Sequence, residues 1–224
     1  MNRSKISVLL RATALTLASG LGTAAWAADN VNDLRAGQWA QWLYSIPASV
    51  NPIADATGQN CMVGQSGSVW YLTPGSGGGT GSRICTVPQG VKLEIMVAGN
   101  TYVYTPGYCG DVAGKTVREL RAAIAAFTDT LTVSATLDGA PAQATRIRSA
   151  TFPAALPADN LFTAFCGGPG SVPAGVYLSV DDAYYAEIEN LSLGTHTLQL
   201  VATNGGSFNR NVVYTLTVVP RNPN

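Results

Sequence analysis

Apolar and polar residues alternate along the C-terminal half of the chain, and a period of two is typical of strands that bury one face. The alternation runs through 131–137 and stops at Asp138-Gly139, a pair that favours a hairpin turn. Further strands are expected at 176–180, 184–188, 196–202 and 212–219. Many short strands separated by Gly, Pro and Asn predict a mainly β fold, an antiparallel β-sandwich with one or two short helices.

The N-terminal half predicts a short helix followed by more strands. Asn32 or Asp33 can cap this helix, and Pro47 helps to end it. A glycine-rich loop over 74–82 is expected to be flexible, and Gly99-Asn100 to form a bend between two strands. The strands around these two connections are expected at 69–72, 83–87, 92–97 and 101–104.

A second helix is predicted after Gly110. Thr116 and Glu119 have the spacing of a capping box, in which each residue satisfies a backbone N–H of the other. The apolar positions then recur at steps of three and four residues: Val117, Leu120, Ile124 and Phe127. This pattern predicts an amphipathic helix packed on a sheet.

The first residues have the features of a cleavable secretory signal peptide. Arg3 and Lys5 precede an apolar stretch over 6–22, and Ala25-Trp26-Ala27 supplies small residues for cleavage after Ala27. Arg11 interrupts the apolar run, which is therefore too short to span a bilayer. We expect a secreted or periplasmic protein with no membrane span in the mature chain. Its segments are 1–27 (signal peptide), 28–115 (β-rich, with the glycine loop) and 116–224 (helix followed by the sandwich).

Four cysteines in an exported chain predict two disulfide bonds. Sequence allows three pairings, and we favour Cys61 with Cys85 and Cys109 with Cys166. The first bond would close the segment around the glycine loop, and the second would join the two halves of the chain. A zinc site is the alternative, but the chain has no Cys-x-x-Cys spacing and no histidine near any cysteine.

Charge argues against a nucleic-acid partner. Only 12% of the residues are charged, and once Arg3, Lys5 and Arg11 are removed with the leader the 13 acidic residues outnumber the 10 basic ones. Phosphate binding by nucleic-acid proteins needs clustered Lys and Arg. The hydrophobic fraction of 46% still allows a full core in one domain or two small ones.

Two parts of the chain resemble known exported proteins. The segment LSLGTHTLQLVA at 191–202, with the strand after it, resembles the end of immunoglobulin-like modules in bacterial surface and secreted proteins; the resemblance covers roughly the last 90 residues. The segments WAQW at 39–42, NCMVGQSG at 60–67 and CTVP at 85–88 resemble uncharacterised exported bacterial proteins that carry such a sandwich. The resemblance implies a fold and assigns no active residue. No Cys, Trp and Cys have the antibody spacing.

Acidic residues give one group of candidate functional side chains. Asp181 and Asp182 adjoin a strand on which Glu187 and Glu189 point to one face, and Asp159 lies in a loop. Two carboxylates on one face can hydrolyse a glycosidic bond, and Asp159, Asp181 and Asp182 are candidate Ca²⁺ ligands. Acids at strand ends are also ordinary solvent-facing residues. The single histidine, His196, is expected to be a strand residue that bonds locally.

Aromatic residues give the other group. Trp39, Trp42, Trp70 and Tyr71 are candidate ligand-binding residues, because exposed rings stack on sugars or anchor protein partners. Packing between helix and sheet is the alternative, since Trp39 and Trp42 have helical spacing. We therefore expect a non-catalytic binding or cell-surface interaction module with an extracellular protein or glycan partner, and no cofactor other than Ca²⁺. The alternatives are a secreted glycan-directed hydrolase and a structural envelope or matrix component.

Overall fold

Two β-sheets and two α-helices form the protein, in a computed structural model that describes residues 34–108, 114–162, 166, 168 and 171–221. The helices are α1 (Leu34–Ser45) and α2 (Val117–Thr128). The first sheet has the order β1-β3-β8-β6, with β7 also paired to β8. The second has the order β2-β10-β9-β4-β5. The strands are β1 (Val69–Leu72), β2 (Gly79–Pro88), β3 (Lys92–Val103), β4 (Thr132–Leu137), β5 (Ala140–Ala142), β6 (Ala144–Arg148), β7 (Phe152–Leu156), β8 (Gly175–Ile188), β9 (Gly194–Thr203) and β10 (Asn209–Val219).

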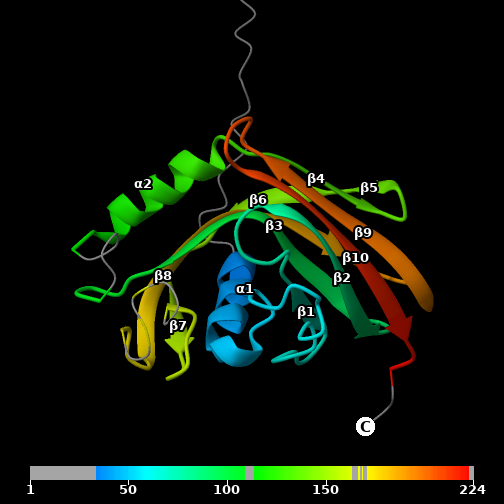
Figure 1. Cartoon of the computed structure of the whole chain (residues 1–224), viewed down its shortest axis with the longest axis horizontal. Coiled ribbons are helices and arrows are strands. Elements are labelled where there is room, and N and C mark those ends of the chain that lie inside the picture. Colours follow the sequence, from blue (N-terminus) through cyan, green and yellow to red (C-terminus); the bar gives the residue numbers. More distant parts are fainter. Residues whose placement is uncertain (1–33, 109–113, 163–165, 167, 169–170, 222–224) are drawn as a thin grey trace, which may run out of the picture.

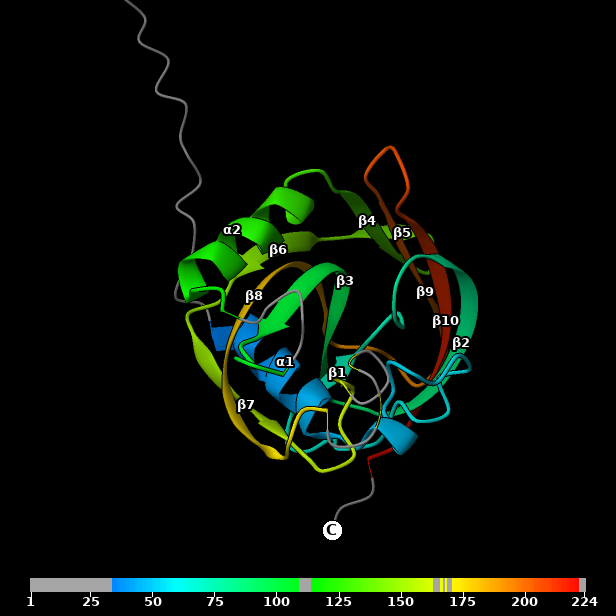
Figure 2. The same ribbon diagram turned by 60° about the vertical axis from the view of Figure 1, so that its left-hand side comes forward.

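The first sheet is curved, and its strands β3 and β8 arch over α1 (Figure 1). Figure 2 shows α1 enclosed between β7 and β8 on one side and β1 on the other. The buried face of α1 carries Trp39, Ala40 and Leu43, which pack against residues of the sheet such as Tyr185. The N-terminal helix therefore supplies residues at the centre of the first hydrophobic core.

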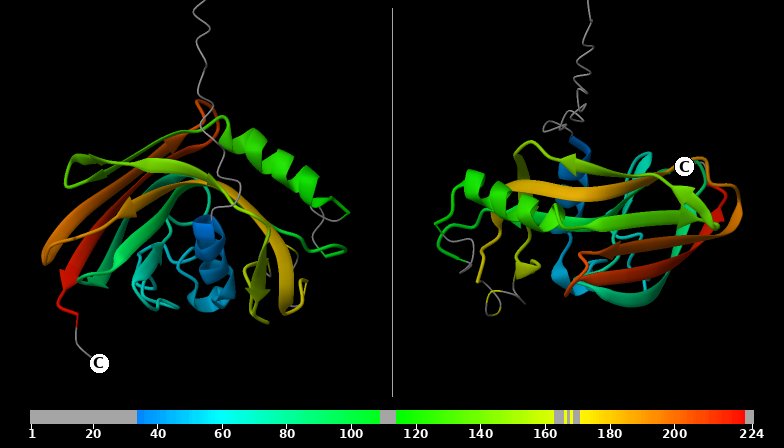
Figure 3. Two further views of the ribbon diagram at one scale, coloured as in Figure 1. Left: turned by 180° about the vertical axis from the view of Figure 1, so that it is seen from behind. Right: turned by 90° about the horizontal axis from the view of Figure 1, so that it is seen from above.

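The other face of the first sheet is shared by two neighbours. The second sheet covers one end of it, and α2 packs on β3 and β8 at the other end (Figure 3). Alternate residues of β9 and β10, including Leu198, Leu200, Tyr214 and Leu216, fill the space between the sheets together with Leu93 of β3. The mainly β fold is therefore confirmed, with two mixed sheets whose facing strands share an apolar core.

Two strand pairs are parallel, so the expectation of an antiparallel sandwich is wrong in this respect. β1 pairs with β3 and β2 pairs with β10 in parallel, and both sheets are mixed. The strands on either side of the glycine-rich loop, β1 and β2, belong to different sheets and do not form a hairpin. Strands from both sides of residue 115 pair in each sheet.

The strands β3 and β8 are longer than expected. Each was predicted as two short strands, whereas Lys92–Val103 and Gly175–Ile188 are continuous. Both faces are covered over most of β3 and over the second half of β8, which removes there the alternation that marks a strand in a sequence. At Gly99 the chain does not turn back. Instead it passes so close to β8 that a Cβ would lie 2.2 Å from Ala183 Cβ, and its φ of 149° suits glycine.

Several local predictions are confirmed. Thr116 and Glu119 form the capping box of α2. Asp138 and Gly139, with φ of 51° and 81°, form the turn between β4 and β5. Cys61 is bonded to Cys85. The leader, the caps Asn32 and Asp33, and Cys109 lie outside the described residues, so export and the bond Cys109–Cys166 stay predictions. No helix in the described part of the chain has the length and apolarity to cross a membrane.

Candidate functional site

The glycine-rich connection between β1 and β2 lines a cavity of about 210 Å³. We name it the glycine-loop pocket. Its walls are the loop and strand residues 74–81, the turn with Ile53, Ala54 and Ala56, and the side chains of Arg83, Arg210 and Val212. The connection was predicted as a loop over 74–82, but β2 already begins at Gly79, which pairs with Arg210 of β10. Backbone pairing therefore orders the second half of the predicted loop.

Two glycines of this segment make room for their neighbours. Gly75 has a φ of 97°, and a Cβ there would lie 3.0 Å from Nη1 of Arg83. Gly78 passes so close to β10 that a Cβ would lie 2.7 Å from the carbonyl oxygen of Asn209. A larger residue at Gly75 would push against a charged group, and one at Gly78 would collide with backbone. The glycine content therefore lets the loop approach Arg83 and β10.

Arg83 projects from the inner face of β2, where strand alternation aligns it with buried Cys85 and Val87. Its side chain is 4% exposed. Nη2 donates to the carbonyl oxygen of Pro52 at 2.7 Å, and the guanidinium lies 5.6 Å from the ring centre of Tyr214. Its Nε is buried and donates to no acceptor in the described residues.

Arg210 projects from the inner face of β10 and is 7% exposed. Nη1 donates to the carbonyl oxygen of Val97 at 2.9 Å. Nε donates to the carbonyl oxygen of Gly77 at 3.1 Å, and Nη2 also donates to this oxygen and, at 3.4 Å, to that of Gly75. Burial lowers the pKa of Arg210 to about 10, because removal from water disfavours the charged form. The group stays charged at neutral pH.

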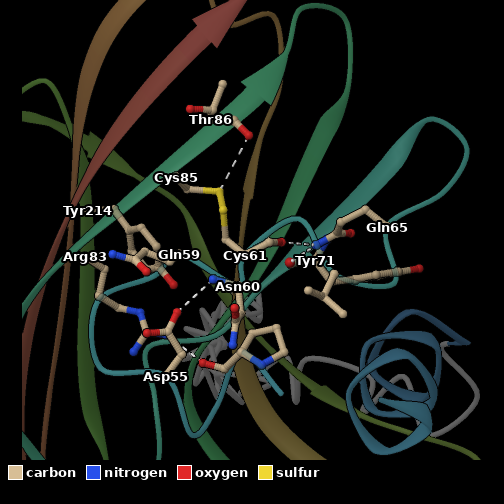
Figure 4. Close-up of a disulfide and its surroundings, with 12 residues drawn as sticks. Asp55, Gln59, Asn60, Cys61, Gln65, Tyr71, Arg83, Cys85, Thr86 and Tyr214 are labelled. Carbon is tan, nitrogen blue, oxygen red and sulfur yellow. Dashed lines mark hydrogen bonds between the residues drawn. A yellow bond between two sulfur atoms is a disulfide. The ribbon is translucent and has the colours of Figure 1, made fainter. Parts of the chain in front are cut away.

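Neither arginine forms an ion pair with a carboxylate of the described residues, since every salt bridge there involves other basic side chains. Asp55 is an acid whose pKa is affected by the charge of Arg83. Burial raises its pKa, but the net shift is downward because of hydrogen bonds from Asn60 and Thr57 and the charge of Arg83. The carboxylate of Asp55 accepts from the backbone N–H of Asn60 at 2.8 Å (Figure 4). It also accepts from the backbone N–H of Thr57 at 2.8 Å. It is therefore engaged in its own turn.

The disulfide bond fastens this turn to the edge of the second sheet. Cys61 is bonded to Cys85 of β2 (Figure 4). The backbone N–H of Ile84 donates to the carbonyl oxygen of Thr57 at 2.8 Å. A Cβ at Gly58 would lie 2.4 Å from the carbonyl oxygen of Ile84. One wall of the pocket is thus held by a covalent bond and by backbone contact.

The predicted ligand-binding aromatic residues lie away from this pocket. Trp39 and Trp42 are 1% and 7% exposed, and their indole N–H groups donate to the carbonyl oxygens of Leu72 and Val63. Neither ring has an open face, so the packing alternative describes them. Trp70 and Tyr71 are half-buried, and the ring of Tyr71 lies 5.7 Å from that of Trp42.

The predicted metal ligands are not brought together. Asp181 and Asp182 lie within β8, 1% and 5% exposed, rather than in a loop. Asp182 accepts from Arg146 at 2.7 Å and from Arg148 at 3.1 Å, while Asp159 accepts from the backbone N–H of Ser49. Throughout 34–108, 114–162 and the described residues that follow, no three His, Cys, Asp or Glu side chains are grouped to hold a metal ion.

The other predicted acids are held in ion pairs. Glu187 contacts Arg35 and, at 2.7 Å, Lys92, which also lies 3.4 Å from Glu189. Both glutamates therefore lie on one face, as predicted. His196 bonds locally, 2.7 Å from Asp138 and 3.0 Å from the carbonyl oxygen of Ser192.

A second cavity, of about 290 Å³, lies between α2 and β8. Its charged lining includes Arg148 and Asp182, which are paired with each other at 3.1 Å. Arg121 also lines this cavity and donates to the carbonyl oxygen of Ser149 at 2.8 Å. The glycine-loop pocket differs because neither of its arginines forms an ion pair with a carboxylate of the described residues, whereas Arg148 here does.

Comparison with known proteins adds little to this geometry. No family model and no curated protein matches the chain. Among solved structures, the chain is similar to one titled "Solution Structure of Amebosin", with 14% sequence identity and a TM-score of 0.26, covering 69% of this chain and 100% of that chain. This likeness is too weak to support a fold or a function.

Sequence reasoning did not single out Arg83 and Arg210. Each occupies an inward position of a strand whose other inward residues are apolar: Cys85 and Val87 in β2, and Val212 and Tyr214 in β10. An arginine on the apolar side of an alternating pattern is the signal that could have found them.

Proposed function

We propose that the protein is an exported, non-catalytic binding module and that the glycine-loop pocket receives its ligand. The observation that carries this proposal is a cavity lined by a glycine-rich segment and by two buried arginines. Binding sites are commonly formed by loops that a rigid scaffold positions. Here the scaffold is the second sheet, and the disulfide bond holds the neighbouring turn against it.

A hydrolase is less favoured by the same contacts. A glycosidase needs one carboxylic acid and one carboxylate that face a substrate. Asp182 is engaged by Arg146 and Arg148, and Glu187 by Arg35 and Lys92. Asp181 is buried within the first sheet and does not face solvent. We therefore place no catalytic step at these residues.

We also propose that the two sheets are related to the immunoglobulin-like modules that the C-terminal sequence resembles. The strand order supports this. Strands β4, β9 and β10 share one sheet, and β3, β8 and β6 share the other, which matches the division of the CFG and BED strands in such modules. The parallel partner β2 extends the sheet of β10.

The binding proposal can be tested by NMR on the isotope-labelled mature protein. Backbone signals would be followed during titration with neutral sugars, small organic acids and short peptides, each class added separately. We expect at least one class to shift signals from Gly75, Gly81, Arg83 and Arg210, since these positions line the pocket. Shifts confined to another face, or none with any class, would contradict the proposal. The control is Gly139, whose turn lies at the end of β4 away from the pocket lining.

A further inference from the structure

We propose that the glycine-loop pocket binds an anionic oxygen group of its ligand, a carboxylate or a phosphate, through Arg83 and Arg210. This inference rests on the proposed binding function and names the chemistry of the ligand. Arginine suits such groups because its planar guanidinium presents N–H donors in a fork that matches two oxygens.

The first observation is an imbalance of charge. Two arginines, both more than nine-tenths buried, lie at one cavity, and neither has a carboxylate within ion-pair distance in the described residues. Buried charges are normally paired, because removal from water is costly unless an opposite charge compensates for it. Asp55 offsets part of this charge, but its oxygens are bonded within its own turn. One positive charge remains in excess at the pocket.

The second observation is an unused donor. Nε of Arg83 is buried without a hydrogen-bond acceptor among the described residues, although Nη2 of the same guanidinium is satisfied by Pro52. Buried polar groups almost always have a partner, so an exception needs an explanation. The guanidinium of Arg83 lines the glycine-loop pocket, so a ligand oxygen in this pocket would lie beside the group.

The third observation is the space. A cavity of about 210 Å³ accommodates a small acidic group together with the adjoining part of a ligand. The residues that face it from 75 to 81 are Gly, Ser and Thr, so no bulky side chain blocks an approach to the backbone. Two exposed alanines, Ala54 and Ala56, also line the cavity.

The test uses acetate, inorganic phosphate and the neutral acetamide as probes at constant ionic strength. Each is titrated into the isotope-labelled mature protein, and the amide signals of 75–81 and the Nε–H signals of the arginines are followed. We expect acetate or phosphate to shift these signals saturably and to bind at least about tenfold more tightly than acetamide. The stronger of the two anions identifies the group on the ligand.

Two kinds of variant test whether the anion binds in the glycine-loop pocket and through its arginines. Arg210→Met keeps the length of the side chain and removes its charge, and we expect a loss of anion affinity of at least about tenfold. Arg118→Met, on the exposed side of α2, is the matched control and should bind as the parent does. Because Arg210→Met removes buried hydrogen bonds and can impair folding, Ala56→Phe provides a second route. This substitution narrows the pocket from an exposed position and leaves both arginines in place. It should also weaken anion binding.

Three results would overturn the inference: equal binding of acetamide and the anions, no saturable shift with either anion, or unchanged anion affinity in a folded Arg210→Met or Ala56→Phe variant. The failures can be told apart. If a neutral compound shifts the pocket signals and the anions do not, the pocket is a binding site and the assigned chemistry is wrong. If no compound shifts these signals, the proposed function fails as well.

Discussion

At the scale of single residues, Asp181 shows how a buried acid is accommodated without a counter-ion. Its carboxyl group accepts from Thr101 Oγ1 at 2.5 Å and from Tyr185 Oη at 3.0 Å. Burial raises its pKa to about 8, with the nearby acids Asp182 and Glu94 adding to the rise and the two hydrogen bonds opposing it. The folded protein therefore keeps this proton at neutral pH.

The raised pKa of Asp181 predicts that the free energy of unfolding falls as the pH rises. The unfolded chain releases the proton near a pKa of 3.8, whereas the folded protein holds it to about 8, so the unfolded state gains from ionisation between these values. From pH 5 to 7 we expect the free energy of unfolding to fall by up to about 3 kcal/mol more in the parent than in Asp181→Asn. Urea denaturation at both values measures this difference. An identical pH dependence in the two proteins would show that Asp181 is ionised when folded.

Glu187 of β8 and Glu189, which follows the end of this strand, give a second prediction at this scale. Glu187 and Glu189 share the side chain of Lys92 on a half-exposed face, away from the glycine-loop pocket. Replacing both by Gln should lower the free energy of unfolding by about 1 kcal/mol or less, because solvent screens such pairs. Affinity for any ligand of the pocket should stay within about threefold. A large loss of turnover on a glycan, in a variant that remains folded, would instead support the hydrolase alternative.

At the scale of the elements, the sequence predicts well where the signal is local. The cap of α2 needs only Thr116 and Glu119, and the turn before β5 needs only Asp138 and Gly139. The full lengths of β3 and β8 are less evident, because the neighbours that bury both faces of most of β3 and of the second half of β8 are distant in sequence. β6 and β7 carry no clear alternation and were not predicted. The partners of Arg83 likewise come from other segments, so its environment could not be inferred from β2 alone.

The disulfide bond gives the prediction for the elements. Replacing Cys61 and Cys85 together by Ser frees the turn of Asp55 from β2, and the free energy of unfolding should fall by about 2 to 4 kcal/mol. Thermal and urea denaturation measure the loss. The same variant examines the second predicted bond, since titration of the denatured, unreduced protein should find no free thiol if Cys109 is bonded to Cys166. Two thiols per chain would refute that pairing.

At the scale of the whole molecule, one short N-terminal helix is surrounded by the first sheet. α1 contributes Trp39, Ala40 and Leu43 to that core, and the ring of Trp39 lies 6.0 Å from the ring of Tyr185 in β8. The helix begins at Leu34, a short distance after the predicted cleavage point at Ala27. Cleavage within α1 would therefore remove residues from the hydrophobic core that the first sheet surrounds.

Export and processing can be measured together. Mass spectrometry of protein recovered from the periplasm or the medium should find Ala28 as the first residue, because Ala25 and Ala27 fit the small-residue positions of a cleavage site. Cleavage there leaves α1 intact. A soluble cytoplasmic product that retains Met1 would contradict export and would remove the reason to expect an oxidising compartment.

The parallel pairing of β2 with β10 has a consequence for the order of events during synthesis. Gly79 and Arg210 become neighbours in the finished sheet, yet the ribosome makes most of the chain between them. Until β10 has been made, β2 lacks its partner, and Arg83 lacks the ring of Tyr214 beneath it. The pocket, with one arginine from each strand, exists only once the last strand has been added. A ligand that occupies it would therefore distinguish finished molecules from nascent or truncated ones.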